Sequence, residues 1–204
     1  VTPADDGRSV EVTFFGVVSN PDWMRYDSST MSAVEQMRWF QDETGVYRLR
    51  VETRPRSWWG YDARYEGTTF VLELRRPVWD AASALPLAGL TVAVDPGHSA
   101  DRGAIGPLGT LEKDINGAIA QCLEKKLKEA GAGVAMIRRG DENVALYARP
   151  RLAWQARADL LVSVHNNALP DGQNPLEKNG YGVYYFQPMS FELARSVHEA
   201  YARR

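Results

Sequence analysis

The chain has 204 residues, of which 44% are hydrophobic, so it is long and apolar enough to form one or two domains with a proper core. A formal net charge of −2 argues against a nucleic-acid partner, which would require a concentrated basic face. The sequence contains no apolar run of about 18 residues, so we expect no membrane span. It contains a single cysteine, Cys122, which excludes an internal disulfide framework.

Composition changes along the chain in a way that predicts two domains. Residues 1–88 hold five of the six tryptophans and no lysine, whereas all five lysines come later. We therefore place a boundary near Pro86, with an accessory domain at 1–86 and a second domain at 87–204.

The accessory domain is predicted to be small and rich in β-structure. Alternating or β-forming residues at 10–15, 46–53 and 68–74 indicate antiparallel strands with one solvated face. Apolar residues at Val34, Met37 and Trp39 or Phe40 favour one short helix over residues 32–40.

The tryptophans of this region allow two interpretations. In so short a domain, bulky side chains such as Trp23, Trp39 and Trp79 are expected to fill a thin core. The alternative is that exposed rings stack on glycan. Neighbours on a strand point to opposite faces, so one of Trp58 and Trp59 is expected to be exposed, and this pair is the best candidate for contact with glycan or a protein partner.

The second domain alternates between strands and helices. Strands are predicted at 91–95, 133–138, 159–164 and 181–186, and helices at 113–130, at 144–157 with an interruption near Pro150, and at 190–203. This order indicates an α/β fold with a mostly parallel sheet covered by helices on both faces. The first helix is predicted to end at Gly131 and to bury Ile115, Ile119, Cys122, Leu123, Leu127 and Ala130.

Three residues at the ends of these elements form a candidate metal site. His98 and His165 each follow a predicted strand, and Glu112 begins the helix between them. Two histidines and a carboxylate are the donor set of a catalytic zinc with one open position. The spacing alone leaves ordinary structural roles open for each histidine, and Glu112 could be a simple first-turn acid.

Several motifs in this order resemble one known family. They are Val94-Asp-Pro-Gly-His98, Gly103-Ala-Ile-Gly106, Glu112-Lys-Asp-Ile-Asn116, Leu146-x-x-Arg149 and Ala158-Asp-Leu-Leu-Val-Ser-Val-His165-Asn-Asn-Ala168. They are similar to motifs of the zinc-dependent N-acetylmuramoyl-L-alanine amidases of bacterial cell walls. The resemblance implies that His98, Glu112 and His165 bind Zn²⁺.

The same resemblance implies an activity, a partner and a location. Family members hydrolyse the amide between the lactyl group of N-acetylmuramic acid and the first alanine of the stem peptide. Peptidoglycan is then the expected partner, in a periplasmic or extracellular, cell-wall-associated location, with a role in wall remodelling or cell separation.

Three further residues are candidates for substrate binding. Asn166 and Asn167 are expected to orient a ligand or contact substrate, although Asn-Asn is also a common end to a strand. Arg149 is expected either to pair with a buried acid such as Asp95 or to bind a stem-peptide carboxylate. The polar stretch 170–179 is predicted to be an exposed loop on the rim of the substrate cleft.

The sequence also departs from the family pattern. Ser99-Ala100 stand where the family usually has glycines. The family's catalytic glutamate lies on a further strand, beyond Arg204, and no acidic residue after His165 has a comparable context. We therefore expect this chain to be a weak or inactive amidase and to self-associate through an uncovered sheet edge. The alternative is a non-catalytic module, with or without zinc, that binds peptidoglycan or a partner.

Overall fold

A computed structural model describes residues 1–19, 33–54, 58–76, 78, 82–170, 172–174 and 176–203. Contacts between residues divide the chain into two compact units, Val1–Pro77 with Gly180–Arg204, and Val78–Asn179. The predicted boundary near Pro86 stays a prediction. Trp23 and Trp79, which were expected in the first core, lie outside the described residues.

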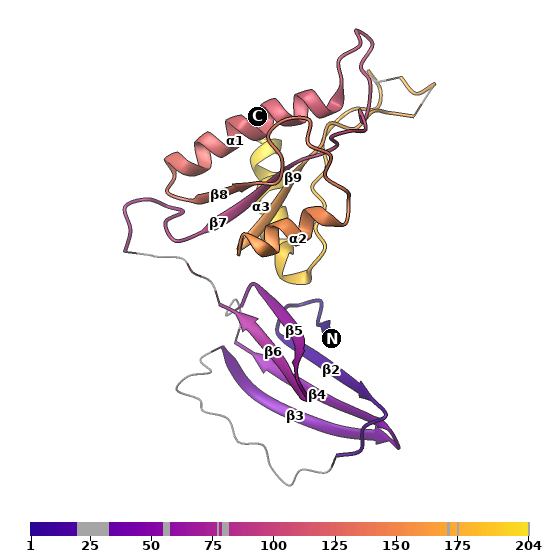
Figure 1. Cartoon of the computed structure of the whole chain (residues 1–204), viewed down its shortest axis with the longest axis vertical. Helices are drawn as coiled ribbons and strands as arrows, with labels where there is room; N and C mark the ends of the chain where they lie inside the picture. The colour runs from indigo at the N-terminus through magenta and orange to yellow at the C-terminus, as the bar shows by residue number, and fades with distance from the viewer. Residues whose placement is uncertain are drawn as a thin grey trace. The chain divides into compact units, whose positions relative to one another are not determined.

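The first unit contains a four-stranded antiparallel sheet and a separate hairpin (Figure 1). The sheet has the order β1 (Thr2–Pro3), β2 (Ser9–Phe15), β4 (Val46–Thr53) and β3 (Val34–Glu43), and the hairpin joins β5 (Gly60–Glu66) to β6 (Thr69–Arg75). The predicted strands at 10–15, 46–53 and 68–74 are confirmed in β2, β4 and β6. The same unit holds the short 3-10 helix η1 (Pro188–Ser190) and α3 (Phe191–Ala202), which confirms the last predicted helix.

The helix predicted over residues 32–40 is wrong, because residues 34–40 lie in β3. Its pairing with β4 shifts register between Val34 and Gln36, which leaves Glu35 as an extra residue. This bulge places Val34 and Met37, three residues apart, against the same core. Residues on one face of a regular strand are two apart, and the extra residue of the bulge makes Val34 and Met37 three apart. This spacing resembles that of a helical turn, which explains the wrong prediction.

The core of the first unit is built around Trp58. This side chain is 2% exposed and packs with Val10, Val34 and Val51. Its indole Nε1 donates to the carbonyl of Gly7 and to Thr53 Oγ1, at 2.9 Å each, so the buried N–H is satisfied. Trp59 is only half-buried, so the predicted role in contacting glycan or a partner stays a prediction for that residue alone.

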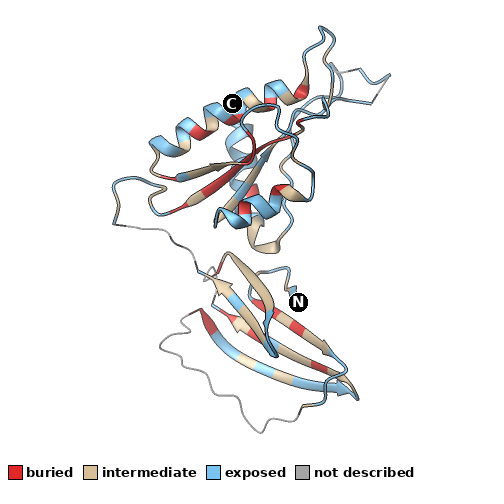
Figure 2. Cartoon of the chain, in the orientation of Figure 1, coloured by how far each residue is buried: buried red, intermediate tan, exposed pale blue. Residues whose placement is uncertain are grey.

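The second unit is organised around a three-stranded parallel sheet. β7 (Thr91–Pro96) lies between β8 (Gly133–Met136) and β9 (Leu160–Val164). The central strand is buried along nearly its whole length (Figure 2), as expected for a strand covered on both sides. A mixed α/β fold with a parallel sheet is therefore confirmed.

The strand predicted at 181–186 is wrong. These residues have no strand structure, and Tyr184 and Phe186 are 89% and 92% exposed. A strand requires a neighbour for its backbone hydrogen bonds, and no described strand pairs with this segment. Its β-forming side chains therefore have no sheet face to bury.

Two helices of the second unit pack on different sides of β7. Val92 and Val94 form one cluster with Ala120 of α1 (Glu112–Glu129). Ala93 points the other way and packs with Ala153 of α2 (Ala148–Gln155). α2 begins four residues later than predicted, so Pro150 lies in its first turn, where the missing N–H costs little, and does not interrupt it. Cover over both whole faces of the sheet stays a prediction.

The buried face of α1 agrees with the predicted one only in part: Leu123 and Leu127 pack against the core, but the first turns differ. Ile115 and Ile119 are 38% and 40% exposed, and Cys122 is also exposed, whereas Asn116 and Ala120 are fully buried. The helix is rotated so that a polar first turn faces the sheet edge. Gly131, at φ 95°, ends the helix as predicted.

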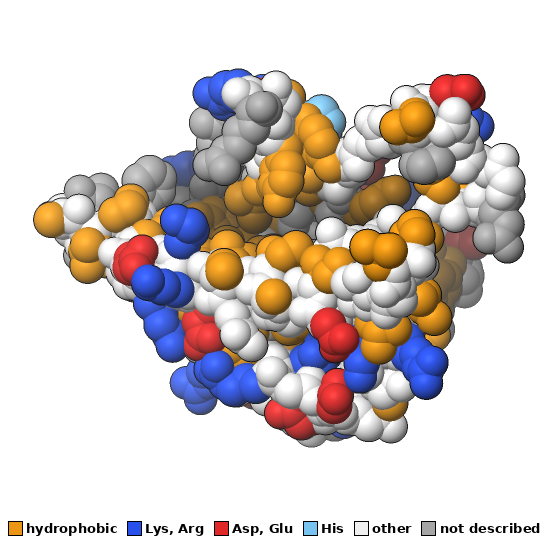
Figure 3. All heavy atoms as spheres, turned by 90° about the horizontal axis from the view of Figure 1, so that it is seen from above, with side chains coloured by type: hydrophobic (Ala, Val, Ile, Leu, Met, Phe, Trp, Pro, Cys, Tyr) orange, Lys and Arg blue, Asp and Glu red, His pale blue; other side chains and the backbone are white. Residues whose placement is uncertain are grey.

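Charged side chains of both signs are interspersed on the face seen in Figure 3, beside a band of hydrophobic side chains. Among the residues that the structure describes, no helix is long and apolar enough to cross a membrane.

Candidate metal centre

The turn after β7 brings His98 to the carboxyl edge of the sheet. His98 has φ 62°, a left-handed conformation that non-glycine residues seldom adopt and that costs on the order of 1–3 kcal/mol. Gly97 N donates to the carbonyl of Val164 at 2.9 Å, so the turn is held against the end of β9. A Cβ on Gly97 would lie 2.3 Å from Cε1 of His165, so a side chain there would occupy the space of the second histidine.

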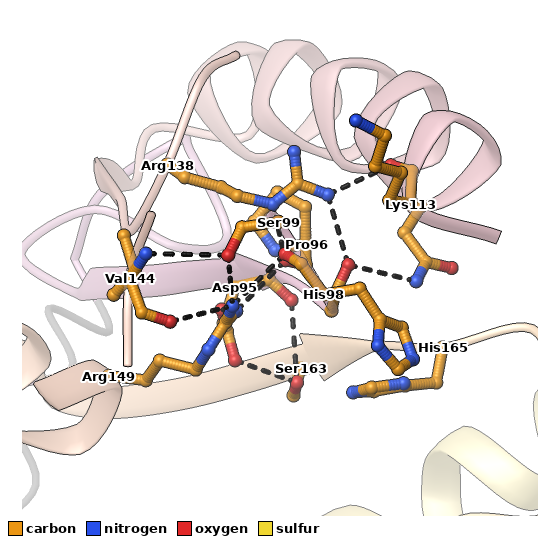
Figure 4. Close-up of polar contacts among 12 residues, drawn as sticks. Asp95, Pro96, His98, Ser99, Lys113, Arg138, Val144, Arg149, Ser163 and His165 are labelled. Carbon is orange, nitrogen blue, oxygen red and sulfur yellow. Dashed lines mark hydrogen bonds and ion pairs between the residues drawn. The ribbon is translucent and has the colours of Figure 1, made fainter. Parts of the chain in front are cut away.

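The structure brings together the three residues that the sequence marked as metal ligands. Nε2 of His98 lies 3.1 Å from Oε2 of Glu112, and Nδ1 of His165 lies 3.1 Å from Oε1 of the same carboxylate. One nitrogen or oxygen atom from each residue falls within 4.8 Å of the others. Figure 4 shows the two imidazole rings close to each other beyond the strand ends, with ring centres 4.9 Å apart.

Glu112 is held as an anion. Burial raises the pKa of this carboxyl, since the side chain is 4% exposed, but several hydrogen bonds outweigh burial and lower the pKa to about 2. The backbone N–H groups of Ala104 and Asn166 donate to it at 2.8 and 3.0 Å, and Asn116 and His165 also contact it. An ionised carboxylate is the form that binds a cation.

Two residues that sequence reasoning missed orient these side chains. Nδ1 of His98 contacts Oδ1 of Asp101, which leaves Nε2 of the ring toward Glu112. Asn116, fully buried, donates to the carbonyl of Gly97 and to Glu112, and accepts from Nδ2 of Asn166 at 2.8 Å. The signal for Asn116 was available, because it follows Glu112 by one helical turn.

The cluster fits a zinc ion by its donors and by the space around it. Two imidazole nitrogens and one carboxylate oxygen are a common donor set for Zn²⁺. Gly103, at φ 65°, passes so close that a Cβ would lie 2.5 Å from Cδ2 of His98 and 2.7 Å from Oε2 of Glu112. Glycine at this position therefore lets the loop pass against the ligand side chains without displacing them.

The three predicted substrate-binding residues occupy different surroundings. Arg149 is buried, and its Nη1 contacts Oδ1 of Asp95 at 2.5 Å, which is the ion pair proposed from the sequence as one of two roles. Asn166 lies beside the cluster through its bonds to Glu112 and Asn116. Asn167 is exposed next to it.

Two buried arginines surround the turn that carries His98 (Figure 4). Besides Asp95, Arg149 donates to the carbonyls of Pro96 and His98. Arg138 is 5% exposed and donates to backbone carbonyls. Burial lowers the pKa of the Arg138 guanidinium, and the nearby charge of Arg149 lowers it further.

A histidine–carboxylate–histidine cluster at the carboxyl ends of parallel strands places the chain in the class of α/β proteins that use this edge of the sheet for chemistry. The chain belongs to the N-acetylmuramoyl-L-alanine amidase family, whose model matches residues 92–204. The family resemblance seen in the sequence motifs is thereby confirmed.

Individual relatives agree with this assignment. The chain is 35% identical over 134 residues to the probable cell wall amidase LytH of Staphylococcus epidermidis, an alignment that covers 64% of this chain and 43% of LytH. It is 42% identical over 101 residues to the N-acetylmuramoyl-L-alanine amidase LytC of Bacillus subtilis, covering 49% of this chain and 19% of LytC. The chain thus spans less than half the length of these relatives.

A solved structure supports the same fold. The catalytic domain of CwlV, an N-acetylmuramoyl-L-alanine amidase from Bacillus (Paenibacillus) polymyxa var. colistinus, is 31% identical and superimposes with a TM-score of 0.51. The match covers 56% of this chain and 63% of that domain.

Proposed function

We propose that this chain binds Zn²⁺ through His98, Glu112 and His165 and hydrolyses the amide between N-acetylmuramic acid and L-alanine in peptidoglycan. The observation that carries the proposal is the convergence of these three side chains at the sheet edge. Membership of the amidase family and the names of the relatives support the reaction class. A cell-wall-associated, extracellular or periplasmic location and a role in wall remodelling belong to the same proposal.

The residues of the chain would divide the work as follows. When bound, zinc supplies a Lewis acid that polarises the amide carbonyl. Glu112 remains ionised because its hydrogen bonds outweigh its burial, and Asp101 holds His98 in the tautomer that leaves Nε2 toward the cluster. Asn166 and Asn167, which follow β9, are expected to contact the stem peptide.

The first experiment compares two histidine variants. The unchanged chain, purified without chelator, should contain equimolar zinc and release free stem peptide from muropeptides at the low rate expected of a weak amidase. His165→Ala should lose both properties, because one of three ligands is gone. His198→Ala is the matched control and should keep both, since this exposed histidine lies on α3, outside the cluster. Equal zinc content in the chain and in His165→Ala would contradict the proposal.

One observation favours the second candidate, a non-catalytic peptidoglycan-binding module. Within the described ranges, the carboxylates bonded to the two histidines of the cluster are Glu112, which is a proposed ligand, and Asp101, which orients His98, so no third carboxylate is bonded there as a proton shuttle. General acid–base help of that kind is worth about 10²- to 10⁴-fold in rate. Zinc binding and sedimentation with purified peptidoglycan, without release of stem peptide, would decide for this alternative.

Self-association through an open sheet edge stays a prediction from the sequence. Sedimentation velocity over a range of concentrations measures it directly.

A further inference from the structure

Arg138 connects the two segments that carry His98 and Glu112. Its Nε donates to the carbonyl of Pro96 at 2.9 Å, and its Nη2 donates to the carbonyls of Gly97 at 3.0 Å and Lys113 at 2.8 Å. Pro96 and Gly97 directly precede His98, and Lys113 directly follows Glu112. Figure 4 shows the guanidinium between the end of β7 and the first turn of α1.

The arrangement is unusual because it buries a cation without an ion-pair partner. Arg149, the neighbouring buried arginine, pairs with Asp95, whereas Arg138 makes no ion pair within the described part of the chain. Its fourth bond goes from Nη1 to the carbonyl of Gly140 at 2.8 Å. Burying an unpaired charge is costly unless hydrogen bonds satisfy it, and only the planar fork of a guanidinium reaches several carbonyls at once.

The bonds of Arg138 act on backbone that is already strained. His98 adopts φ 62°, and the preceding carbonyl of Gly97 is held twice, by Arg138 and by Nδ2 of Asn116 at 3.2 Å. Released from these bonds, the turn would relax toward an ordinary backbone conformation and move Nε2 of His98 away from Glu112.

We propose that Arg138 is a positioning residue that sets the distance and orientation between His98 and Glu112 and so preorganises the metal site. It touches neither ligand side chain and acts through the carbonyls of Pro96, Gly97 and Lys113. The proposal rests on the metal centre of the proposed function.

The test replaces Arg138 by lysine, which keeps the charge but cannot make the same set of bonds. Arg138→Lys should bind Zn²⁺ about 10- to 100-fold more weakly than the unchanged chain, measured by competition with a chromophoric chelator. Arg139→Lys is the matched control: the adjacent side chain is 62% exposed and pairs with Glu124, so zinc affinity should not change. Thermal unfolding of both variants in excess chelator reports whether the metal-free fold is intact.

A spectroscopic measurement separates positioning from a general loss of structure. With Co²⁺ in place of zinc, the visible absorption bands report the geometry of the metal, and they should shift in Arg138→Lys and not in Arg139→Lys. Equal zinc affinity and equal Co²⁺ spectra in Arg138→Lys and the unchanged chain would overturn the proposal for Arg138 alone. Absence of zinc binding by the unchanged chain would overturn the metal centre together with it.

Unfolding would also be decisive. If the metal-free forms of Arg138→Lys and of a second variant, Arg138→Gln, are both unfolded in chelator, Arg138 supports the whole domain and the positioning role is wrong.

Discussion

At the scale of single residues, the three candidate ligands could be predicted from the sequence and their supports could not. His98, Glu112 and His165 each stand at the end of a strand or the start of a helix, where local pattern is informative. Asp101 contacts the ring of His98, and Arg138 donates to the backbone of the turn that precedes it. The left-handed residue of this turn is His98 itself, and because it is not a glycine the sequence gives no signal for the turn. Arg149 had two open roles, and its ion pair with Asp95 became visible only in the structure.

Gly103 provides a prediction at this scale. A Cβ at this position would lie 2.5 Å from the ring of His98, so Gly103→Ala should push the imidazole aside and weaken zinc binding by about tenfold or more. Gly109→Ala is the control, because Gly109 has a similar φ of 80° in the same loop with nothing within 4 Å of a Cβ. Both variants carry the same backbone strain, so a difference in zinc affinity reports the contact with His98. Equal affinities would show that the ring has room to move.

At the scale of elements, type was easier to predict than orientation. The extent of α1 was predicted to within one residue at each end, but its buried face only in part, at Leu123 and Leu127. The stripe that faces the sheet begins with Glu112 and Asn116 and continues through Ala120, so its first turn is polar. The apolar pattern predicts Ile115 and Ile119 as buried instead, and so it assigns the wrong face of the first turns to the sheet. The prediction for residues 32–40 was wrong for a related reason, because a bulge in β3 gave its apolar residues helical spacing.

The C-terminal half of α1 provides a prediction about acid stability. Hydrogen bonds from Arg139 and then Lys128, both within 3.0 Å, lower the pKa of Glu124 to about 2 from 4.5. A carboxyl whose pKa is lower in the folded state stabilises the fold above the unfolded pKa, and this contribution is lost as pH falls through the folded value. The relevant window therefore runs from the ordinary glutamate pKa of 4.5 down to about 2.

Glu124→Gln should remove this contribution. It should cost about 1 kcal/mol in the free energy of unfolding near neutral pH, a modest figure because solvent screens the pair, and nothing at the acid end of the window. Urea unfolding of both chains across this pH range measures the difference. Glu129→Gln is the control, since Glu129 is 61% exposed and lies 3.9 Å from Lys125. A constant difference between Glu124→Gln and the unchanged chain at every pH would contradict the argument.

At the scale of the whole molecule, the order of elements predicted an α/β domain after a β-rich one, because hydrophobic periodicity is a local property. Which segments associate is a tertiary property. Residues 180–204 cluster with Val1–Pro77 in the structure, and Met189 packs against the core that contains Trp58. The family model extends through these residues, so their assignment to the second domain stays a prediction. The segment predicted as a fourth strand belongs to this same region, and none of the strands that the structure describes pairs with it.

The division into two units leads to a prediction about the metal centre. Among the described residues, the groups that contact the cluster, from Asp101 and Ala104 to Asn116 and Asn166, lie between Val78 and Asn179. A fragment of residues 78–179 should therefore fold and bind zinc with the affinity of the full chain, because it keeps the sheet, α1, α2 and both buried arginines. Calorimetric titration of both proteins with Zn²⁺ measures this, and the fragment carrying His165→Ala controls for adventitious binding. A folded fragment with tenfold weaker binding or worse, a loss of at least about 1.4 kcal/mol, would mean that residues outside 78–179 complete the site.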